Sequence, residues 1–280
     1  MTRRLDRATV DGIELEYETR GAGEPVVLVH AGVFTGFSLP LLEQPALIER
    51  YRVVHYHRVG CAGSSRVAGA VGVADEAAHC AALMRQLGID RAHIVGHSNS
   101  ANLALQLALD APQAVQSLVL IEPALQHVPS AARRAKEFLI PAFERYRAGD
   151  KAGAIDLFLR GTCGPNYRSV LDQVLPGAFD RAVADADTFF AQQLPALQAW
   201  SFGAEEARRI TQPVLAVVGE ISQQIDPIWN ERQALLLSWL PQAEAFVLPG
   251  ATHLMQAQNP RGMAGALAAF FARHSLTMPA

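Results

Sequence analysis

The sequence predicts an α/β fold with a mostly parallel central sheet, helices that flank the sheet and an inserted helical segment. Three observations support this prediction. Apolar runs of strand length recur along the chain, helical stretches separate most of them, and one long interval shows helical spacing alone. With 280 residues, 50% of them hydrophobic, the chain is long enough to bury an extensive core.

The first two strands are expected to form an antiparallel hairpin. Residues 8–10 and 13–17 are short amphipathic stretches, and Asp11-Gly12 separates them. This dipeptide favours a tight hairpin turn. The two stretches should therefore pair with opposite directions.

The next strands show the pattern of a buried parallel sheet. Residues 25–30 form a continuous apolar run that ends in a turn at residues 30–33. Such runs are typical of central strands, because both faces of these strands are buried. Helical stretches at residues 73–87 and 99–109 alternate with further runs of this type. These runs cover residues 51–56, 92–95, 117–121, 214–218 and 245–248.

One interval breaks the alternation and predicts two structural parts. Residues 124–209 contain no convincing strand and should form a helical insert after the strand that ends near Glu122. Residues 1–123 and 210–280 then form the core domain. Within the insert, helical spacing covers residues 131–147, 152–159, 167–175 and 181–200, and the expected helix breakers are Pro129, Pro141, Gly161, Gly164-Pro165 and Pro176-Gly177.

Composition and charge exclude several classes of partner. The net charge is −3, and the nearest approach to a basic cluster is Arg133, Arg134 and Lys136, which we interpret as a solvated helix face. We therefore expect no nucleic-acid partner. No apolar run is long enough to cross a bilayer, and no apolar stretch follows Arg3 and Arg4, so neither a membrane anchor nor a signal peptide is expected.

The three cysteines predict a reducing compartment. Cys61, Cys80 and Cys163 are scattered without CxxC spacing. This usage suits reduced thiols in a cytoplasmic protein better than disulfides or a zinc site. We expect a cytoplasmic protein without a metal site, and a homodimer is compatible with the sequence.

The segment Gly96-His97-Ser98-Asn99-Ser100 contains the candidate nucleophile. It places Ser98 between an apolar strand and a helix of small residues. A tight strand-to-helix turn exposes such a serine and leaves room only for small residues two positions to either side. Gly96 meets this condition, and Ser100 stands where the usual pattern has a second glycine. The alternative interpretation is that Ser98 only caps the helix.

Together with other segments, this motif makes residues 13–271 resemble the α/β-hydrolase family. Residues 58–65 look like the RGxGxS loop of that family. Residues 248–253 look like its final strand and histidine loop, and Asn259-Pro260 like the start of its last helix. The resemblance implies an α/β-hydrolase fold with residues 124–209 as a helical cap. It also implies that Ser98 is the nucleophile.

A serine nucleophile needs an imidazole within hydrogen-bond reach, and the sequence has nine histidines. His253 is preferred because it follows the last apolar run, and loops at this sheet edge converge on the nucleophile. His97 is expected to point elsewhere on so tight a turn. His55 and His57 lack a third metal ligand nearby and are expected to be buried or to support a loop, and His30 should shape the turn that follows it.

The oxyanion hole requires two backbone N–H groups that face the developing negative charge. The resemblance implies that Asn99, directly after the nucleophile, supplies one of them. The second should come from the turn that the family writes His-Gly-x. Here the turn reads His30-Ala31-Gly32-Val33, so both Gly32 and Val33 are candidates.

The acid that orients His253 has two main candidates. The family usually places it shortly after the next-to-last strand, but Ser222 occupies that place here and has no carboxylate. Glu122 ends the strand after the nucleophile helix, where some family members place their acid, and we favour it slightly. Asp226 is the alternative, although Asp226-Pro227 also reads as a helix start, and Glu220 is a third choice.

The expected reaction is hydrolysis of an acyl bond. Serine at the nucleophile position argues against the family's dehalogenases and epoxide hydrolases, which attack through a carboxylate. We therefore expect a cofactor-free serine hydrolase of a small or medium apolar ester or lactone. Alternatives are hydrolysis of a carbon–carbon bond in a ring-fission diketone and a noncatalytic small-ligand receptor. The insert could roof an apolar substrate with Phe138, Phe143, Phe158, Phe189, Phe190, Trp200 and Phe202, most of them expected in its own core.

Overall fold

The computed structural model describes residues 5–276, and its first two strands form an antiparallel hairpin. Strand β1 (Asp6–Val10) pairs with β2 (Ile13–Arg20). Asp11 and Gly12 have φ angles of 50° and 80°. Both turn residues are thus in the left-handed region that a type I′ turn requires, which confirms the hairpin predicted from this dipeptide.

In residues 5–276, eight strands form one sheet in the order β1-β2-β4-β3-β5-β6-β7-β8. The hairpin strands are antiparallel, and the other six strands are parallel to one another. Between β3 and β5, the direction in which successive strands are added to the sheet reverses. Sheets of this kind bind ligands at such a point, outside the carboxyl ends of the strands. The parallel strands are β3 (Glu24–Val29), β4 (Tyr51–Tyr56), β5 (Ala92–His97), β6 (Val115–Ile121), β7 (Val214–Gly219) and β8 (Ala243–Leu248).

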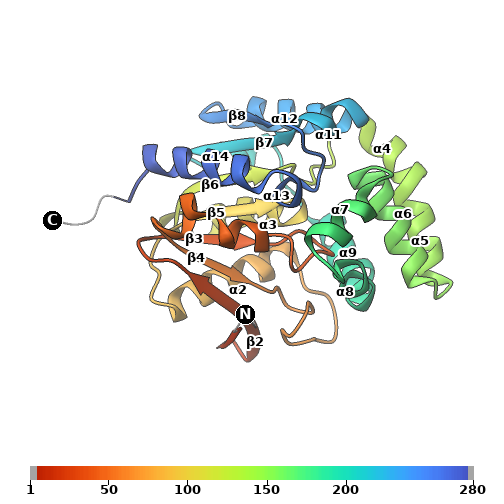
Figure 1. The fold of residues 1–280 in the computed structure, drawn as a ribbon, viewed down its shortest axis with the longest axis horizontal. Coiled ribbons are helices and arrows are strands. Elements are labelled where there is room, and N and C mark those ends of the chain that lie inside the picture. Colours follow the sequence, from red (N-terminus) through yellow and green to blue (C-terminus); the bar gives the residue numbers. More distant parts are fainter. Residues whose placement is uncertain (1–4, 277–280) are drawn as a thin grey trace.

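Helices cover both faces of the sheet (Figure 1). In β3, Val27 and Val29 pack in one core with α2 (Val73–Gln86) and α3 (Asn99–Asp110), whereas Val26 and Leu28 pack in a second core with α14 (Pro260–Arg273). This alternation confirms that the strand is buried on both faces. Outside the insert the helices are α1 (Pro45–Ile48), α2 (Val73–Gln86), α3 (Asn99–Asp110), α11 (Glu220–Ile225), α12 (Ile228–Trp239), α13 (Met255–Gln258) and α14 (Pro260–Arg273). No helix in residues 5–276 has the length and apolarity to span a bilayer.

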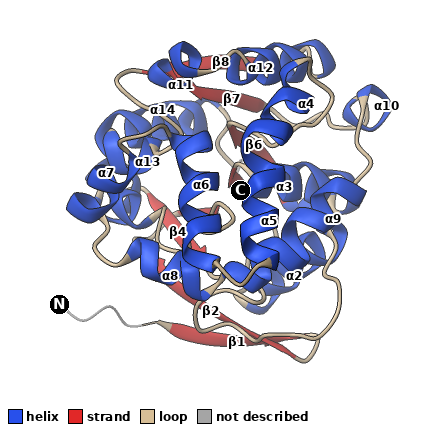
Figure 2. Ribbon diagram, turned by 90° about the vertical axis from the view of Figure 1, so that its right-hand side faces the viewer, coloured by secondary structure: helices blue, strands red, loops and turns tan. Residues whose placement is uncertain are grey.

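The chain between β6 and β7 is helical, and its helices gather at one end of the sheet (Figures 1 and 2). Most of them pack in a separate core that also contains Phe34 and Phe37 from the segment after β3, whereas Phe202 and Ala207 near the end of the insert pack in the core of the sheet. This segment is called the insert below (residues 124–209). Its helices are α4 (Ser130–Arg134), α5 (Ile140–Arg147), α6 (Lys151–Cys163), α7 (Tyr167–Val174), α8 (Ala178–Ala184), α9 (Leu194–Ala199) and α10 (Ala204–Ala207).

Two of the expected helix breakers lie inside helical segments. Pro141 is in α5, which follows α4 without a gap because a π-helical turn at Ala135–Leu139 joins them. Such a turn widens the helix directly before the proline ring. Gly161 lies inside α6, where a Cβ atom would be 2.4 Å from Cγ of Phe138. This glycine therefore permits close packing, and the helix ends instead at Gly164, whose φ is 89°.

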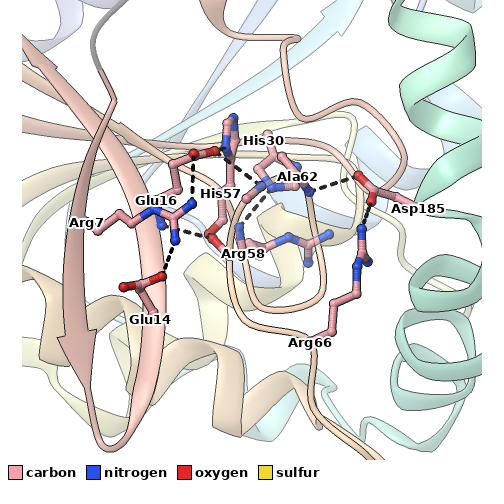
Figure 3. A network of polar contacts seen from close by, with 11 residues as sticks. Arg7, Glu14, Glu16, His30, His57, Arg58, Ala62, Arg66 and Asp185 are labelled. Carbon is pink, nitrogen blue, oxygen red and sulfur yellow. Dashed lines mark hydrogen bonds and ion pairs between the residues drawn. The ribbon is translucent and has the colours of Figure 1, made fainter.

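The loop after β4 connects the hairpin to the insert (Figure 3). On the hairpin side, Glu16 Oε2 accepts hydrogen bonds from His57 Nδ1 at 2.8 Å and from the Gly63 amide at 3.2 Å. On the other side, Asp185, the residue after α8, accepts from the Ala62 amide at 3.1 Å and from Arg66 Nη2 at 2.7 Å. His57 supports this loop, as expected, and the loop fixes the insert beside β4.

Candidate active site

The turn between β5 and α3 holds Ser98 in a conformation that few residues adopt. Ser98 has a φ of 59° and a ψ of −122°. A Cβ atom on Gly96 would be only 2.3 Å from the carbonyl oxygen of Ser100, so a larger residue at Gly96 would displace the backbone of α3. The turn therefore requires Gly96 and exposes Ser98 at the carboxyl end of β5.

Ser100 has a contact that a glycine could not make. Its hydroxyl is buried and donates a hydrogen bond to the carbonyl oxygen of His30 at 2.5 Å. This bond ties the start of α3 to the end of β3, next to the turn at residues 30–33. The serine in place of the family's second glycine thus links the two turns that frame the site.

The turn after β3 presents free amides to the same pocket as Ser98. Gly32, Val33 and Asn99 all line this pocket. Within residues 5–276, the N–H groups of these three residues donate to no protein acceptor. They are therefore available to a ligand. A Cβ atom on Gly32 would be 2.7 Å from the Phe189 ring, so the insert packs directly on this turn.

His30 supports the turn from behind. Its Nδ1 donates to the carbonyl oxygen of Ala31 at 2.8 Å, and its Nε2 accepts from the Arg58 amide at 3.1 Å. Burial lowers the pKa of His30 well below its usual value, and the positive charge of Arg58 lowers it further. The ring is therefore neutral, with one nitrogen donating and one accepting.

His253 lies against Glu122 at the edge of the sheet. Nδ1 of His253 and Oε2 of Glu122 are 2.5 Å apart, and both side chains are buried. The second carboxylate oxygen of Glu122 accepts from the Gly219 amide at 2.9 Å. Glu122 has a φ of 41°, and its amide donates to the carbonyl oxygen of Val217 on β7. The backbone thus turns at the end of β6 and places this carboxylate beside the histidine.

The environment shifts the pKa values of this pair in opposite directions. Burial raises the pKa of Glu122 to about 7, although the hydrogen bond from Gly219 and the nearby Ser222 hydroxyl oppose the shift. Burial lowers the pKa of His253 to about 3, and the positive charges of Arg232 and Arg134 add to the effect. The imidazole is therefore neutral at pH 7, so its Nε2 can take a proton.

Asp226 is bound elsewhere. Both of its carboxylate oxygens accept from Arg133 at 2.8 Å. In addition, Oδ2 accepts from Arg134 at 3.0 Å, and Oδ1 accepts from the Ile228 amide at 2.9 Å. It makes no hydrogen bond to His253 in the described chain. The third acid candidate, Glu220, accepts from the Gly250 amide at 2.8 Å. The structure therefore pairs His253 with Glu122 rather than with either alternative.

Side chains from the insert and the core enclose a pocket above Ser98 and His253. It has about 900 Å³ of space, including its open mouth. Phe138, Phe158 and Phe189 line it from the insert. Of the other expected aromatic residues, Phe143 and Phe190 pack inside the insert. Trp200 and Phe202 stack on each other and pack in the core with α2 and α3.

The remaining histidines do not line the pocket. His97 lies 4.9 Å from the Phe37 ring and 4.4 Å from the His253 ring, measured between centroids, so it is a packing residue. His55 is buried below the turn, 5.3 Å from the His57 ring. The described residues contain no group of three or more His, Cys, Asp or Glu side chains that could hold a metal ion.

Comparison with known proteins agrees with this architecture. A family model described as the alpha/beta hydrolase fold matches residues 24–157, from β3 through the turn at Ser98 into α6. The chain has the α/β-hydrolase fold, and this segment of it matches that family. The turn at residues 30–33, Ser98 and Glu122 all lie within the matched segment.

Curated relatives match part of this α/β-hydrolase chain. It is 39% identical over 117 residues to the dihydrolipoyllysine-residue acetyltransferase component of an acetoin cleaving system from Cupriavidus necator. The aligned segment covers 41% of this chain and 31% of that protein. It is 37% identical over 123 residues to a Caulobacter vibrioides protein named "Putative carbamate hydrolase RutD", which covers 42% of this chain and 45% of that protein. The chain thus matches less than half the length of these relatives.

Solved structures share the fold over nearly the whole chain. An esterase from Thermogutta terrifontis has a TM-score of 0.81 at 20% identity and covers 98% of this chain and all of its own. An enol-lactonase from Burkholderia xenovorans LB400 also has a TM-score of 0.81 at 20% identity. This match covers 95% of the present chain and 100% of the enol-lactonase. At this identity the likeness shows the fold alone.

Three residues of the pocket were not predicted from the sequence. Arg134 was expected on a solvated helix face, but its side chain is only 11% exposed, because it binds Asp226 and the carbonyl oxygen of Gly161. Trp229 stacks on His253 with 4.7 Å between ring centroids and an interplanar angle of 24°. Arg134 and Arg232 line the pocket as well. A signal was present for two of them, because Trp229 and Arg232 are three residues apart at the start of α12. That spacing places both side chains on one helix face, near the edge of the sheet where the parallel strands end.

Proposed function

We propose that this α/β hydrolase cleaves a small or medium carboxylic ester or lactone, without a cofactor, through Ser98, His253 and Glu122. The observation that carries the proposal is the buried His253–Glu122 pair beside the pocket that Ser98 lines. A neutral imidazole that a carboxylate orients can activate a serine hydroxyl. Ser98 Oγ has no protein hydrogen-bond partner in residues 5–276, so it is free to meet a substrate.

The first half of the reaction forms an acyl-enzyme. Ser98 Oγ attacks the substrate carbonyl carbon as its proton passes to Nε2 of His253, and Glu122 accepts from Nδ1–H and stabilises the imidazolium. The amides of Asn99 and of Gly32 or Val33 donate to the oxyanion. The tetrahedral intermediate then breaks its bond to the leaving oxygen, which takes the proton from His253.

The second half releases the acid. Water attacks the acyl carbon while His253 Nε2 takes one of its protons, and the same amides stabilise the second oxyanion. The bond between the acyl carbon and Ser98 Oγ breaks, and Oγ recovers the proton. The product is a carboxylic acid, and the free serine is restored.

The pocket and the structural relatives support an ester or lactone as the bond that is cleaved. Phe138, Phe158, Phe189 and other apolar side chains line much of the pocket, which suits a small apolar acyl or ring group. Solved structures with this fold include proteins named as an esterase and as an enol-lactonase. Another is named as a meta-cleavage product hydrolase, so carbon–carbon bond hydrolysis is the competing activity to test.

Fluorophosphonate labelling tests the proposal. The wild-type protein should be labelled on Ser98, as mass spectrometry of the peptide would show, and Ser98→Ala should not be labelled. The wild-type protein should also hydrolyse short 4-nitrophenyl esters faster than ring-fission diketones. A wild-type protein that neither reacts with the probe nor hydrolyses any ester would contradict the proposal and favour a noncatalytic receptor.

A further inference from the structure

Arg232, on α12, is an arginine of the pocket with a free end. Its Nε donates to the carbonyl oxygen of Leu125 at 2.9 Å. In the part of the chain that the structure describes, its two Nη atoms have no hydrogen-bond or ion-pair partner. The other arginine of the pocket differs, because Arg134 binds Asp226 at 3.0 Å and the carbonyl oxygen of Gly161 at 2.8 Å.

Arg232 lies beside the reacting groups. Its Cζ atom is 5.5 Å from the centroid of the Trp229 ring, and that ring stacks on His253. Its positive charge is the largest charge effect on the pKa of His253, after burial. A group bound by the Nη atoms of Arg232 would therefore lie close to a carbonyl held above Ser98.

In residues 5–276, no carboxylate lines the pocket to pair directly with this guanidinium. The described lining residues include two arginines and no aspartate or glutamate. Asp226 pairs with Arg133 and Arg134, whereas Arg232 has no ion-pair partner in the described residues. Burial lowers the pKa of Arg232 to about 10, and Arg134 lowers it as well, whereas the charges of Glu122, Asp226 and Glu231 oppose the shift, so the group is still protonated at pH 7. Arg232 is only partly exposed, and a cation with limited access to water is costly unless an anion pairs with it.

We propose, on the basis of the function proposed above, that Arg232 binds an ionised carboxylate on the substrate. The preferred substrates are then esters or lactones that carry one carboxylate. A carboxylate fits because the free end of a guanidinium presents two N–H donors in one plane, which match its two oxygens. One arginine whose Nη atoms have no direct partner in the described residues also matches a single carboxylate.

The competing role for Arg232 is purely electrostatic. Its charge also favours the ionised form of Glu122. In that case its loss would slow neutral and anionic substrates equally, because it would act on the triad. A substrate-binding role predicts a change in the ratio between the two substrates, so the ratio separates the two roles.

The experiment compares matched substrates that differ by one carboxylate. One pair is 4-nitrophenyl hexanoate and mono-4-nitrophenyl adipate, with the charge on the acyl side. The other pair is phenyl acetate and 3-acetoxybenzoate, with the charge on the alcohol side. The wild-type protein should have a kcat/KM at least about tenfold higher for the anionic member of one pair, as a charge-assisted hydrogen bond provides.

Two variants locate the effect. Arg232→Gln should abolish the preference, mainly through a higher KM for the anionic substrate. Arg133→Gln is the matched control, because Arg133 binds Asp226 but does not line the pocket, and it should keep the preference. Wild-type protein without preference in either pair would overturn the proposal. So would an equal loss for both members of a pair in Arg232→Gln.

A binding measurement keeps this inference separate from the proposed function. Calorimetric titration of the two anionic products, adipate and 3-hydroxybenzoate, into Ser98→Ala should show binding of at least one, and Ser98→Ala/Arg232→Gln should lose it. If no Ser98-dependent hydrolysis occurs at all, the proposed function fails, and these titrations still decide whether the carboxylate site exists. Absence of binding of both products to Ser98→Ala would overturn the site.

Discussion

Two residues of the site, Ser98 and Glu122, have positive φ angles although neither is a glycine. Such conformations are costly and persist where neighbouring contacts hold them. The Ser98 amide donates to the carbonyl oxygen of Ile121 at 2.9 Å, and the Ser98 carbonyl oxygen accepts from Ala101 and Ala124. The ends of β5 and β6 therefore fix each other, and with them the relative positions of the two functional side chains.

Ser100 tests the link between the two turns. Ser100→Ala removes the buried hydrogen bond to the carbonyl oxygen of His30 and should lower the free energy of unfolding by about 1 kcal/mol. Because His30 begins the turn that carries Gly32 and Val33, kcat should fall as well. Urea denaturation and ester hydrolysis measure the two effects. Unchanged stability and unchanged kcat would show that this bond does not support the site.

The pKa of Glu122 predicts the acid side of the pH profile. The carboxylate has to be ionised to stabilise the imidazolium, and burial raises its pKa to about 7, so kcat/KM should fall as the pH drops through 7. His253 would stay neutral to much lower pH, because its own pKa is lowered. The measurement is kcat/KM for a neutral ester between pH 4 and pH 9. A profile that is level from pH 5 to pH 9 would contradict this assignment.

Among the secondary-structure elements, α4 and α12 are joined by Asp226. Burial alone would raise its pKa, but hydrogen bonds from Arg133, the Ile228 amide and Arg134 lower it. A lowered carboxyl pKa contributes stability at neutral pH that is lost as the pH falls through that pKa. Asp226 therefore holds the insert to the core as a carboxylate.

Asp226→Asn should weaken this connection. Losing hydrogen bonds to charged partners in a partly buried site should lower the free energy of unfolding by about 1–3 kcal/mol at pH 7. The loss should become smaller at acidic pH, where the wild-type carboxylate is protonated too. Urea denaturation at pH 7 and at low pH measures both values. Equal stability of variant and wild type at pH 7 would show that Asp226 does not anchor α4.

For single elements, the sequence predicts the strands better than the insert helices. Continuous apolar runs and the Asp11-Gly12 dipeptide are compatible with few local structures. The observed hairpin and parallel strands therefore agree closely with those predicted from the sequence. Pro141 and Gly161 are expected to break helices, but both lie inside helical segments. A π-helical turn precedes Pro141, and Phe138 packs against Gly161 within α6. Both depend on contacts between segments, which local sequence does not contain.

In the whole molecule, the core supplies Ser98, His253 and Glu122, and the insert closes the pocket above them. Motif order along the chain was enough to propose Ser98 and His253, because strand ends meet at one edge of the sheet. The same reasoning favours Glu122 over Asp226 only slightly. What separates the two acids is the positive φ of Glu122 and the pairing of Asp226 with Arg133 and Arg134, and only the folded chain brings these residues together.

The most direct test of the account compares kcat for Glu122→Gln and Asp226→Asn with kcat for the wild-type protein. Removing the charge behind His253 should lower kcat by about 10³–10⁴-fold in Glu122→Gln. Asp226→Asn should keep kcat within about threefold of wild type, because Asp226 contacts the arginines of α4 and not the histidine. Circular dichroism would confirm that both variants are folded. Wild-type kcat in Glu122→Gln with a large loss in Asp226→Asn would contradict the account.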